Sequence, residues 1–168
     1  DMVAAARSAG VMGVHVGTGG RLLDDAGYSA LAGSGLDILS VFLGAHTEET
    51  YRRLFGIDGL ASVRAFIENA VATRRALGRF APLVIAELVK MRMVEGEIEE
   101  FFDHWYAHSD ASVIRPYNDF AGRIEDAATI HMRTSSRIPC RKILSELYID
   151  ANGTAYPCRQ DICGTRPL

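Results

Sequence analysis

Apolar and polar positions along the chain alternate between two kinds of segment. Short, nearly continuous apolar runs are typical of buried strands, and the segments between them carry apolar residues at helical spacing. The strand-like runs cover residues 11–16, 36–43, 83–89 and 111–115, and the helical segments cover 2–9, 24–31, 48–54, 60–71 and 96–106. This alternation predicts parallel βα units whose helices cover the sheet. It is compatible with a barrel or with an open doubly wound sheet, and four units are few for a closed barrel of about eight.

Capping residues mark the ends of several helical segments. Gly10 stands where the first helix would end in a left-handed cap, and Asp24 can cap the next helix through its side-chain oxygen. Thr47 stands where another helix begins, directly before Glu48 and Glu49. We therefore expect separate short helices between the strands rather than long continuous ones.

A glycine-rich turn follows the first apolar run. It has the sequence Gly17-Thr18-Gly19-Gly20, at the carboxyl end of the predicted strand. Glycines let a backbone approach a ligand closely, and barrel-type folds place their chemistry at the carboxyl ends of the strands. Thr18, Gly19 and Gly20 are therefore candidate cofactor-binding residues, with a plain βα turn as the alternative.

The last part of the chain predicts a cysteine-bearing β-hairpin. The apolar run 147–149 and the segment 154–156 flank Asn152-Gly153, a strong signal for a tight turn with a positive φ. Such a hairpin would bring Cys140 and Cys158 together, and Cys163 follows shortly afterwards. Two thiolates can share a soft metal centre such as iron–sulfur or zinc, but they do not complete a four-ligand site. The alternative is a buried hairpin in which the thiols only pack as small apolar groups.

Composition and charge narrow the classes of function. The chain of 168 residues has a net charge of −3 with acidic and basic residues interspersed, so it has no basic patch that would suggest nucleic acid as a partner. Its apolar runs are too short to span a membrane, and no segment resembles a signal peptide. Three cysteines are an odd number, which favours a metal site in a reducing compartment, so we expect a cytoplasmic location. The sequence does not indicate an oligomeric state.

The spacing of Cys140, Gly153 and Cys158 resembles the opening of the SPASM domain of radical S-adenosylmethionine enzymes. In that pattern nine to fifteen residues separate the first cysteine from a glycine, and four residues separate the glycine from the second cysteine. Earlier motifs occur in the order found in the later two-thirds of the radical S-adenosylmethionine partial barrel. They are Thr18-Gly19-Gly20-Arg21-Leu22-Leu23, Ser34-Gly35-Leu36-Asp37 and Glu49-Thr50-Tyr51.

The resemblance implies an α/β fold with two parts. Residues 1–120 would form a partial (β/α) barrel of parallel strands that lacks its first two units, and residues 136–168 would form a small, truncated iron–sulfur hairpin domain. We therefore expect the chain to be an internal piece of a longer protein. Two further βα units would precede it, and a second group of cysteines would follow Leu168.

The implied function is that of a radical S-adenosylmethionine enzyme which modifies a peptide or small molecule by hydrogen-atom abstraction. Cys140 and Cys158 would hold an auxiliary 4Fe-4S cluster, with Cys163 as a further candidate metal ligand. S-adenosylmethionine and the catalytic 4Fe-4S cluster would have their ligands outside this chain, because no Cys-three-Cys-two-Cys loop occurs in it. The chain alone is therefore expected to be inactive.

Several positions depart from the family pattern or allow another interpretation. Phe42-Leu43-Gly44-Ala45 stands where relatives often have Ser-Leu-Asp-Gly, so we expect this strand end to pack rather than to bind S-adenosylmethionine. The polar residues Arg115, Tyr117, Asn118 and Asp119 either contact a ligand or form an ordinary turn. His104 and His108 have the spacing of a helical zinc pair, but a solvated helix end is favoured.

Two other functions remain open. One is a non-enzymatic, degenerate partial barrel with a zinc-binding hairpin, in which Cys140, Cys158, Cys163 and His131 make four tetrahedral ligands. The other is a phosphate-binding barrel that uses residues 17–20, although Arg21 is the one basic residue there. Visible absorption separates iron–sulfur from zinc, because only the former absorbs in that range.

Overall fold

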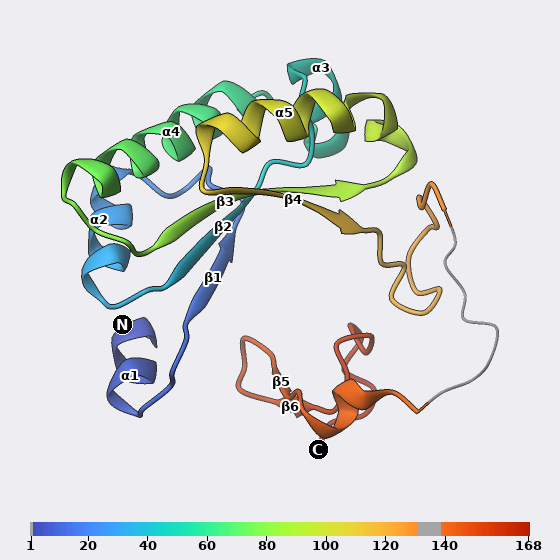
Figure 1. Ribbon diagram of the computed structural model, residues 1–168. Coiled ribbons are helices and arrows are strands. Elements are labelled where there is room, and N and C mark those ends of the chain that lie inside the picture. The colour runs from blue at the N-terminus through green and yellow to red at the C-terminus, as the bar shows by residue number, and fades with distance from the viewer. Residues whose placement is uncertain (1, 131–138) are drawn as a thin grey trace. The chain divides into compact units, whose positions relative to one another are not determined.

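The structure is a computed structural model that describes residues 2–130 and 139–168 and divides the chain into two units, Asp1–Pro116 and Tyr117–Leu168 (Figure 1). Each unit is described by itself. His131, proposed as a fourth zinc ligand, and residues 136–138 of the expected hairpin domain lie outside the described residues.

The first unit is a four-stranded parallel sheet with strand order β1-β2-β3-β4. Its strands are β1 (His15–Thr18), β2 (Ile38–Phe42), β3 (Leu83–Lys90) and β4 (Ala111–Pro116). Its helices are α1 (Met2–Ser8), α2 (Asp25–Gly33), α3 (Glu48–Phe55), α4 (Leu60–Ala76), the 3-10 helix η1 (Arg92–Glu97) and α5 (Ile98–His108). The predicted alternation of parallel strands and helices is confirmed.

The strand order has no reversal, which distinguishes this sheet from a doubly wound one. Every crossover leads to the next strand in the same direction, and right-handed crossovers then place all their helices on the same face. Figure 1 shows α3, α4 and α5 together over one face of the sheet. The described strands are therefore singly wound. We call the face opposite these helices the open face.

The core lies between the sheet and these helices. Leu39, Val41, Val84, Ala86 and Leu88 alternate along β2 and β3 and are fully buried. The predicted apolar stripe of α4 is buried as well, and Phe101 and Trp105 of α5 are 0% exposed. Because successive side chains of a strand point to opposite faces, the residues between these positions belong to the open face.

The predicted helix caps are confirmed. Asp24 Oδ1 accepts a hydrogen bond from Gly27 N at 2.7 Å, and Thr47 Oγ1 accepts one from Thr50 N at 3.3 Å. Gly10 has a φ of 85°, and Val11 N donates to Ala6 O at 3.1 Å, the closing bond of a Schellman motif. These local signals set helix boundaries because they satisfy backbone groups that a helix end leaves unpaired.

The predicted strand over residues 11–16 is wrong in its boundaries, since β1 begins at His15. Arg7 Nη1 donates to the carbonyls of Val11, at 3.2 Å, and Met12, at 2.7 Å, so these two residues are bonded to α1, and bonding to β2 starts only at Val14, whose carbonyl accepts from Ile38 N at 3.3 Å. Gly17 and Thr18, predicted as part of the turn, lie inside the strand. The glycine turn therefore starts at Gly19.

The second unit contains the predicted hairpin, formed by β5 (Tyr148–Ile149) and β6 (Ala155–Tyr156), preceded by the 3-10 helix η2 (Arg141–Leu144). Asp150 organises the turn, because its Oδ1 accepts from Asn152 N at 2.8 Å and from Thr154 N at 2.9 Å. Gly153 has a φ of 86°, the left-handed conformation that glycine adopts most easily. The positive φ expected in this turn is thus found at Gly153.

Within the described residues, no helix is both long enough and apolar enough to cross a membrane.

Candidate functional site

The hairpin brings Cys140 and Cys158 to one pocket. This cavity of about 180 Å³ is also lined by Lys142, Tyr148 and Arg159. Cys140 precedes η2 and Cys158 follows β6, so the antiparallel pairing of β5 and β6 returns the second cysteine toward the first. The structure therefore places the two predicted thiol ligands along the same cavity wall.

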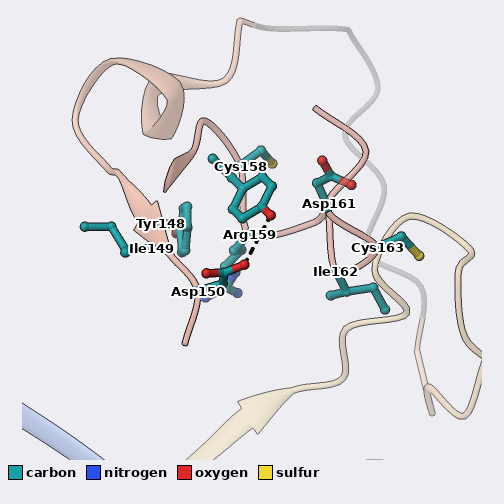
Figure 2. A pocket seen from close by; sticks show the side chains of 10 residues that line it. Tyr148, Ile149, Asp150, Cys158, Arg159, Asp161, Ile162 and Cys163 are labelled. Atoms are coloured by element: carbon teal, nitrogen blue, oxygen red, sulfur yellow. Dashed lines mark hydrogen bonds between the residues drawn. The ribbon is translucent and has the colours of Figure 1, made fainter. Parts of the chain in front are cut away.

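Cys158 also lines a second pocket of about 340 Å³, which it shares with Cys163. Figure 2 shows Tyr148, Ile149 and Asp150 at one end of this pocket, and Ile162 and Cys163 at the other. Cys158 thus belongs to both cavities, while Cys140 and Cys163 each line one of them. All three predicted metal ligands border the pockets of this unit.

The three thiols are free, and none of them is buried. The alternative in which they pack inside a buried hairpin is therefore wrong. Gln160 N lies 3.5 Å from Cys158 Sγ as a hydrogen-bond donor, and Arg123 Nη1 lies 4.0 Å from Cys163 Sγ. Hydrogen bonds to sulfur tune metal-bound thiolates, so these contacts suit a thiolate centre.

The donor set fits a thiolate-bound metal only in part. Across residues 2–130 and 139–168, no group of three or more His, Cys, Asp or Glu side chains lies close enough to hold a metal ion. Cys140 and Cys158 would supply two ligands and Cys163 would supply a third only after a local rearrangement.

The carboxylates around these pockets stabilise turns. Hydrogen bonds from the amides of Thr154 and Asn152 hold the pKa of Asp150 below its usual range. The amide and hydroxyl of Thr165 lower the pKa of Asp161 in the same way. Both groups are therefore kept as anions by the loops that they organise, which makes them poor proton donors near neutral pH.

The predicted cofactor-binding residues Thr18, Gly19 and Gly20 lie at the carboxyl edge of the sheet. Gly20 N donates to Thr18 Oγ1 at 3.1 Å, and a Cβ on Gly20 would come within 2.9 Å of Val41 and 3.0 Å of Val63. Gly20 is therefore needed for packing. Gly19 is exposed with nothing within 4 Å of a Cβ, so its backbone is open to a ligand, and the cofactor assignment stays a prediction.

The strand end at Phe42-Leu43-Gly44-Ala45 packs against α3. Leu43 and Ala45 are 0% exposed, and a Cβ on Gly44 would meet the Phe55 ring at 2.7 Å. Phe42 and Phe55 make an edge-to-face contact with ring centroids 6.1 Å apart. These contacts support the packing interpretation of this segment.

A polar line crosses the open face of the sheet, with one residue from each strand. It consists of His15, Ser40, Glu87 and Arg115. Each member lies two positions further along its strand than the residue that pairs with the previous member; Ser40, for example, lies two positions beyond Ile38, which pairs with His15. His15 Nε2 lies 2.7 Å from Ser40 Oγ, and Glu87 binds Arg115 through two contacts of 2.6 Å. The residues beside the line include Ile85 and Val113. A ligand on this face would therefore meet a polar line with apolar flanks.

Neither Glu87 nor the alignment of the line was predicted from the sequence. The available signal was a single acidic residue inside the apolar run 83–89, which is unusual for a strand buried on both faces. The Glu87 side chain is only 10% exposed, whereas that of Arg115 is 45% exposed. The ion pair therefore leaves part of the Arg115 side chain accessible on the open face.

The other polar residues after β4 form a turn in the second unit. Asn118 Oδ1 accepts from Phe120 N at 3.1 Å, and Tyr117 Oη donates to Glu125 O at 2.6 Å. Asp119 O accepts from the amides of Arg123 and Ile124. The turn interpretation is supported for these residues, and Arg115 alone of the cluster belongs to the open face.

His104 and His108 stack with ring centroids 4.4 Å apart, and His108 Nδ1 lies 2.7 Å from His104 O. His46, from the loop after β2, contacts the His104 ring at 5.8 Å. In the same region the amide of His46 and the hydroxyl of Thr47 donate to Glu97, which ties this loop to η1. This arrangement is an electrostatic cluster at the helix ends and does not present a set of metal ligands.

Comparison with protein-family models, with curated proteins and with solved structures found no match.

Proposed function

We propose that this chain is part of a radical S-adenosylmethionine enzyme with a SPASM-type auxiliary iron–sulfur domain. The first unit would be a section of the partial barrel wall, and the second would be the start of the cluster-binding domain. The substrate would be a peptide or a small molecule, modified by hydrogen-atom abstraction. The singly wound sheet supports the first assignment, because successive parallel strands with helices on one face are the arrangement of a barrel wall.

The observation that carries the metal assignment is the lack of buried residues in the described part of the second unit. None of its described residues, 117–130 and 139–168, is buried. A short unit without a hydrophobic core usually needs a metal, disulfides or a partner to remain folded. Its three thiols are free and border its pockets, so a metal bound by Cys140 and Cys158 is the most economical source of that stability.

The residues of the chain would contribute binding and orientation. Cys140 and Cys158 would hold the auxiliary cluster, which supplies an electron acceptor or a ligand for the substrate when it is bound. Glu87 orients Arg115 on the open face, and His15 and Ser40 offer further hydrogen-bonding groups along the same line. The apolar flanks would exclude water from a substrate held there, which strengthens these polar contacts.

The test is anaerobic reconstitution of the protein with iron and sulfide. We expect visible absorption and stoichiometric iron and acid-labile sulfide, both strongly reduced in the Cys140→Ala and Cys158→Ala variants. Ser145→Ala, an exposed hydroxyl between the two cysteines, serves as the matched control and should retain the metal. Unchanged iron and sulfide in the double cysteine variant would contradict the assignment.

A second candidate is a non-enzymatic partial barrel with a zinc hairpin. Its supporting observation is the same pair of thiols, since zinc also binds cysteine and stabilises small domains. Purified protein that holds one equivalent of zinc, lacks visible absorption and does not incorporate iron would favour this candidate. Cys163→Ala is expected to weaken zinc more than iron–sulfur binding, because three thiols with one further ligand would complete a zinc site.

A further inference from the structure

A cavity of about 180 Å³ lies between α2, α4 and the loop that leads into β3. Pro82, which directly precedes β3, and Gly33, at the end of α2, both line it. It therefore opens at the edge where strands begin, whereas Thr18 lies at the end of β1. This cavity shares no lining residue with the two pockets of the cysteines or with the polar line on the open face.

Two lining side chains are buried and carry polar atoms without partners. Tyr28 is 3% exposed and Arg74 is 8% exposed. Among residues 2–130 and 139–168, neither Tyr28 Oη nor Arg74 Nε has a hydrogen-bond partner. Buried donors are nearly always satisfied in folded proteins, so two such atoms beside one cavity call for a ligand or water that completes them.

The charge near the cavity favours an anion. Arg74 is neutralised by its ion pair with Asp110, and Arg74 Nη1 donates to the carbonyls of Arg79, at 3.2 Å, and Phe80, at 3.3 Å. The guanidinium of Arg79 forms no ion pair within the described part of the chain, although Arg79 lines the cavity. Burial raises the pKa of Tyr28, Arg74 acts to lower it, Asp110 acts to raise it, and Arg79 lowers it more weakly, so the Asp110 carboxylate that neutralises Arg74 also acts on this hydroxyl and Arg79 supplies the uncompensated positive charge.

The remaining wall is largely apolar. Ala32, Leu77 and Pro82 contribute to it, and Leu77 keeps 61% of its surface exposed although it is a large hydrophobic residue. The volume corresponds to about six waters at ~30 Å³ each, which leaves room for a chain of about four to six carbons. An inorganic anion would leave these apolar walls without contacts.

We propose that this cavity binds a short-chain monocarboxylate, with its carboxylate beside Tyr28, Arg74 and Arg79 and its hydrocarbon chain against Ala32, Leu77 and Pro82. The site does not depend on the proposed radical chemistry. Its distance in the fold from the carboxyl ends of the strands suits a regulatory ligand more than a reacting one.

The test is a titration of the protein with sodium hexanoate, followed by backbone amide NMR. We expect saturable chemical-shift changes confined to residues 28–33 and 73–83. Hexanamide and inorganic phosphate should each bind at least about tenfold more weakly than hexanoate, a difference in binding free energy of about 1.4 kcal/mol or more. Equal binding of hexanamide would show that the cations take no part. Equal binding of phosphate would identify a general anion site. Either result overturns the proposal.

Two variants and one control make the test specific. Arg79→Gln and Tyr28→Phe are each expected to weaken hexanoate binding about tenfold, whereas Arg75→Gln, an exposed neighbour on α4 that does not line the cavity, should not. Tyr28→Phe should also leave the melting temperature of the ligand-free protein unchanged or raised, because the lost hydroxyl has no partner. A clear fall in melting temperature, or undiminished binding by both variants, would contradict the proposal.

Discussion

The two units of this chain are stabilised in different ways. In Asp1–Pro116 a parallel sheet and its crossover helices enclose a core that includes Leu39, Ile67 and Trp105, each 0% exposed. In Tyr117–Leu168 none of the described residues is buried, and the hydrogen bonds of Asp150 and Asp161 organise its turns. The first unit can therefore fold through hydrophobic burial, whereas the second depends on local polar contacts and, we propose, on a metal held by its cysteines.

The largest effect expected from this difference is the response to metal removal. Chelation of the reconstituted protein should unfold the hairpin and leave the sheet intact, because structural zinc sites contribute about 10–16 kcal/mol of apparent binding energy to small domains and iron–sulfur ligation acts in the same sense. Hydrogen exchange measures both units at once. The amide of Asp150, which bonds to Thr154 O, should lose protection, while the amide of Leu43, which bonds to Glu87 O, should keep it. Equal protection of Asp150 with and without metal would refute the metal-dependent fold.

Truncation of apolar side chains should have the next largest effect, and only in the sheet unit. Phe101 is 0% exposed, so Phe101→Ala should lower the free energy of unfolding by about 3–5 kcal/mol. Ile149 lies in the hairpin and is 64% exposed, so Ile149→Ala should change stability by no more than about 0.5 kcal/mol. Urea denaturation of each variant gives both values. A comparable loss in the Ile149 variant would mean that the hairpin has a core of its own or packs on another surface.

Two glycines with positive φ, one in each unit, allow the cost of adding a Cβ to be compared between the units. Gly44 has a φ of 78° and a Cβ there would lie 2.7 Å from the Phe55 ring, whereas Gly153 has a φ of 86° and nothing within 4 Å. Gly153→Ala should cost about 1–2 kcal/mol for its left-handed backbone, and Gly44→Ala should cost a further ~1–3 kcal/mol for overpacking.

Hydrogen exchange at Leu43 N gives the loss of stability in the Gly44 variant. Metal content at saturating and limiting iron gives the loss of metal-bound fold in the Gly153 variant. If the loss of stability in the Gly44 variant were no larger than the cost of its left-handed backbone, α3 would move away from Gly44 without cost. The Gly44 result also tests whether this strand end is reserved for packing, as its contacts with Phe55 indicate.

The sequence predicted those features that depend on local patterns. The runs that became β2, β3 and β4 are apolar and bounded by turn residues, and Asp24 and Thr47 satisfy helix amides within their own segments. The boundary of β1 was not predicted because side-chain hydrogen bonds from Arg7 and to Asp37 hold the backbone of the segment before it. The pattern of apolar residues does not reveal either hydrogen bond. Long-range polar contacts of this kind depend on the packed structure and not on periodicity.

The candidate sites show the same division. Cys140, Gly153 and Cys158 were recognisable because their spacing follows from one hairpin. The polar line on the open face required the register of four strands, since Glu87 and Arg115 are far apart in sequence and meet only when β3 pairs with β4. The cavity beside Tyr28 was not recognisable for a similar reason, because helices from two different βα units form it.

The smallest expected effect concerns the histidines at the ends of the helices in the sheet unit. Burial lowers the pKa of His46, and the nearby Arg64 lowers it further, although Glu100 and Glu97 act in the opposite direction. Arg64 Nη2 lies 3.3 Å from His46 Nδ1 and also donates to the His46 carbonyl. The side chain of Glu100 is 75% exposed and its carboxylate is 3.9 Å from His46 Nε2, so it offsets these effects only weakly.

His104 faces the same cations. Burial lowers its pKa, and His108, Arg64 and His46 lower it further, whereas Glu68 opposes them. A histidine whose pKa is lower in the folded state takes up its proton more readily when the chain unfolds. Its contribution to stability is therefore fully present above about pH 6.5, the unfolded value, and is lost as the pH falls through the folded value.

The sheet unit should accordingly lose stability as the pH falls below about 6.5, while the lowered pKa of Glu97 keeps that carboxylate charged. His104→Gln should flatten this dependence, because a neutral side chain cannot acquire charge beside Arg64. His15→Gln, on the open face and outside the cluster, is the matched control and should preserve the slope. The urea midpoint of the sheet unit, followed through hydrogen exchange at Leu43, measures each case. An unchanged slope in His104→Gln would show that His104 takes up its proton beside Arg64 without a loss of stability.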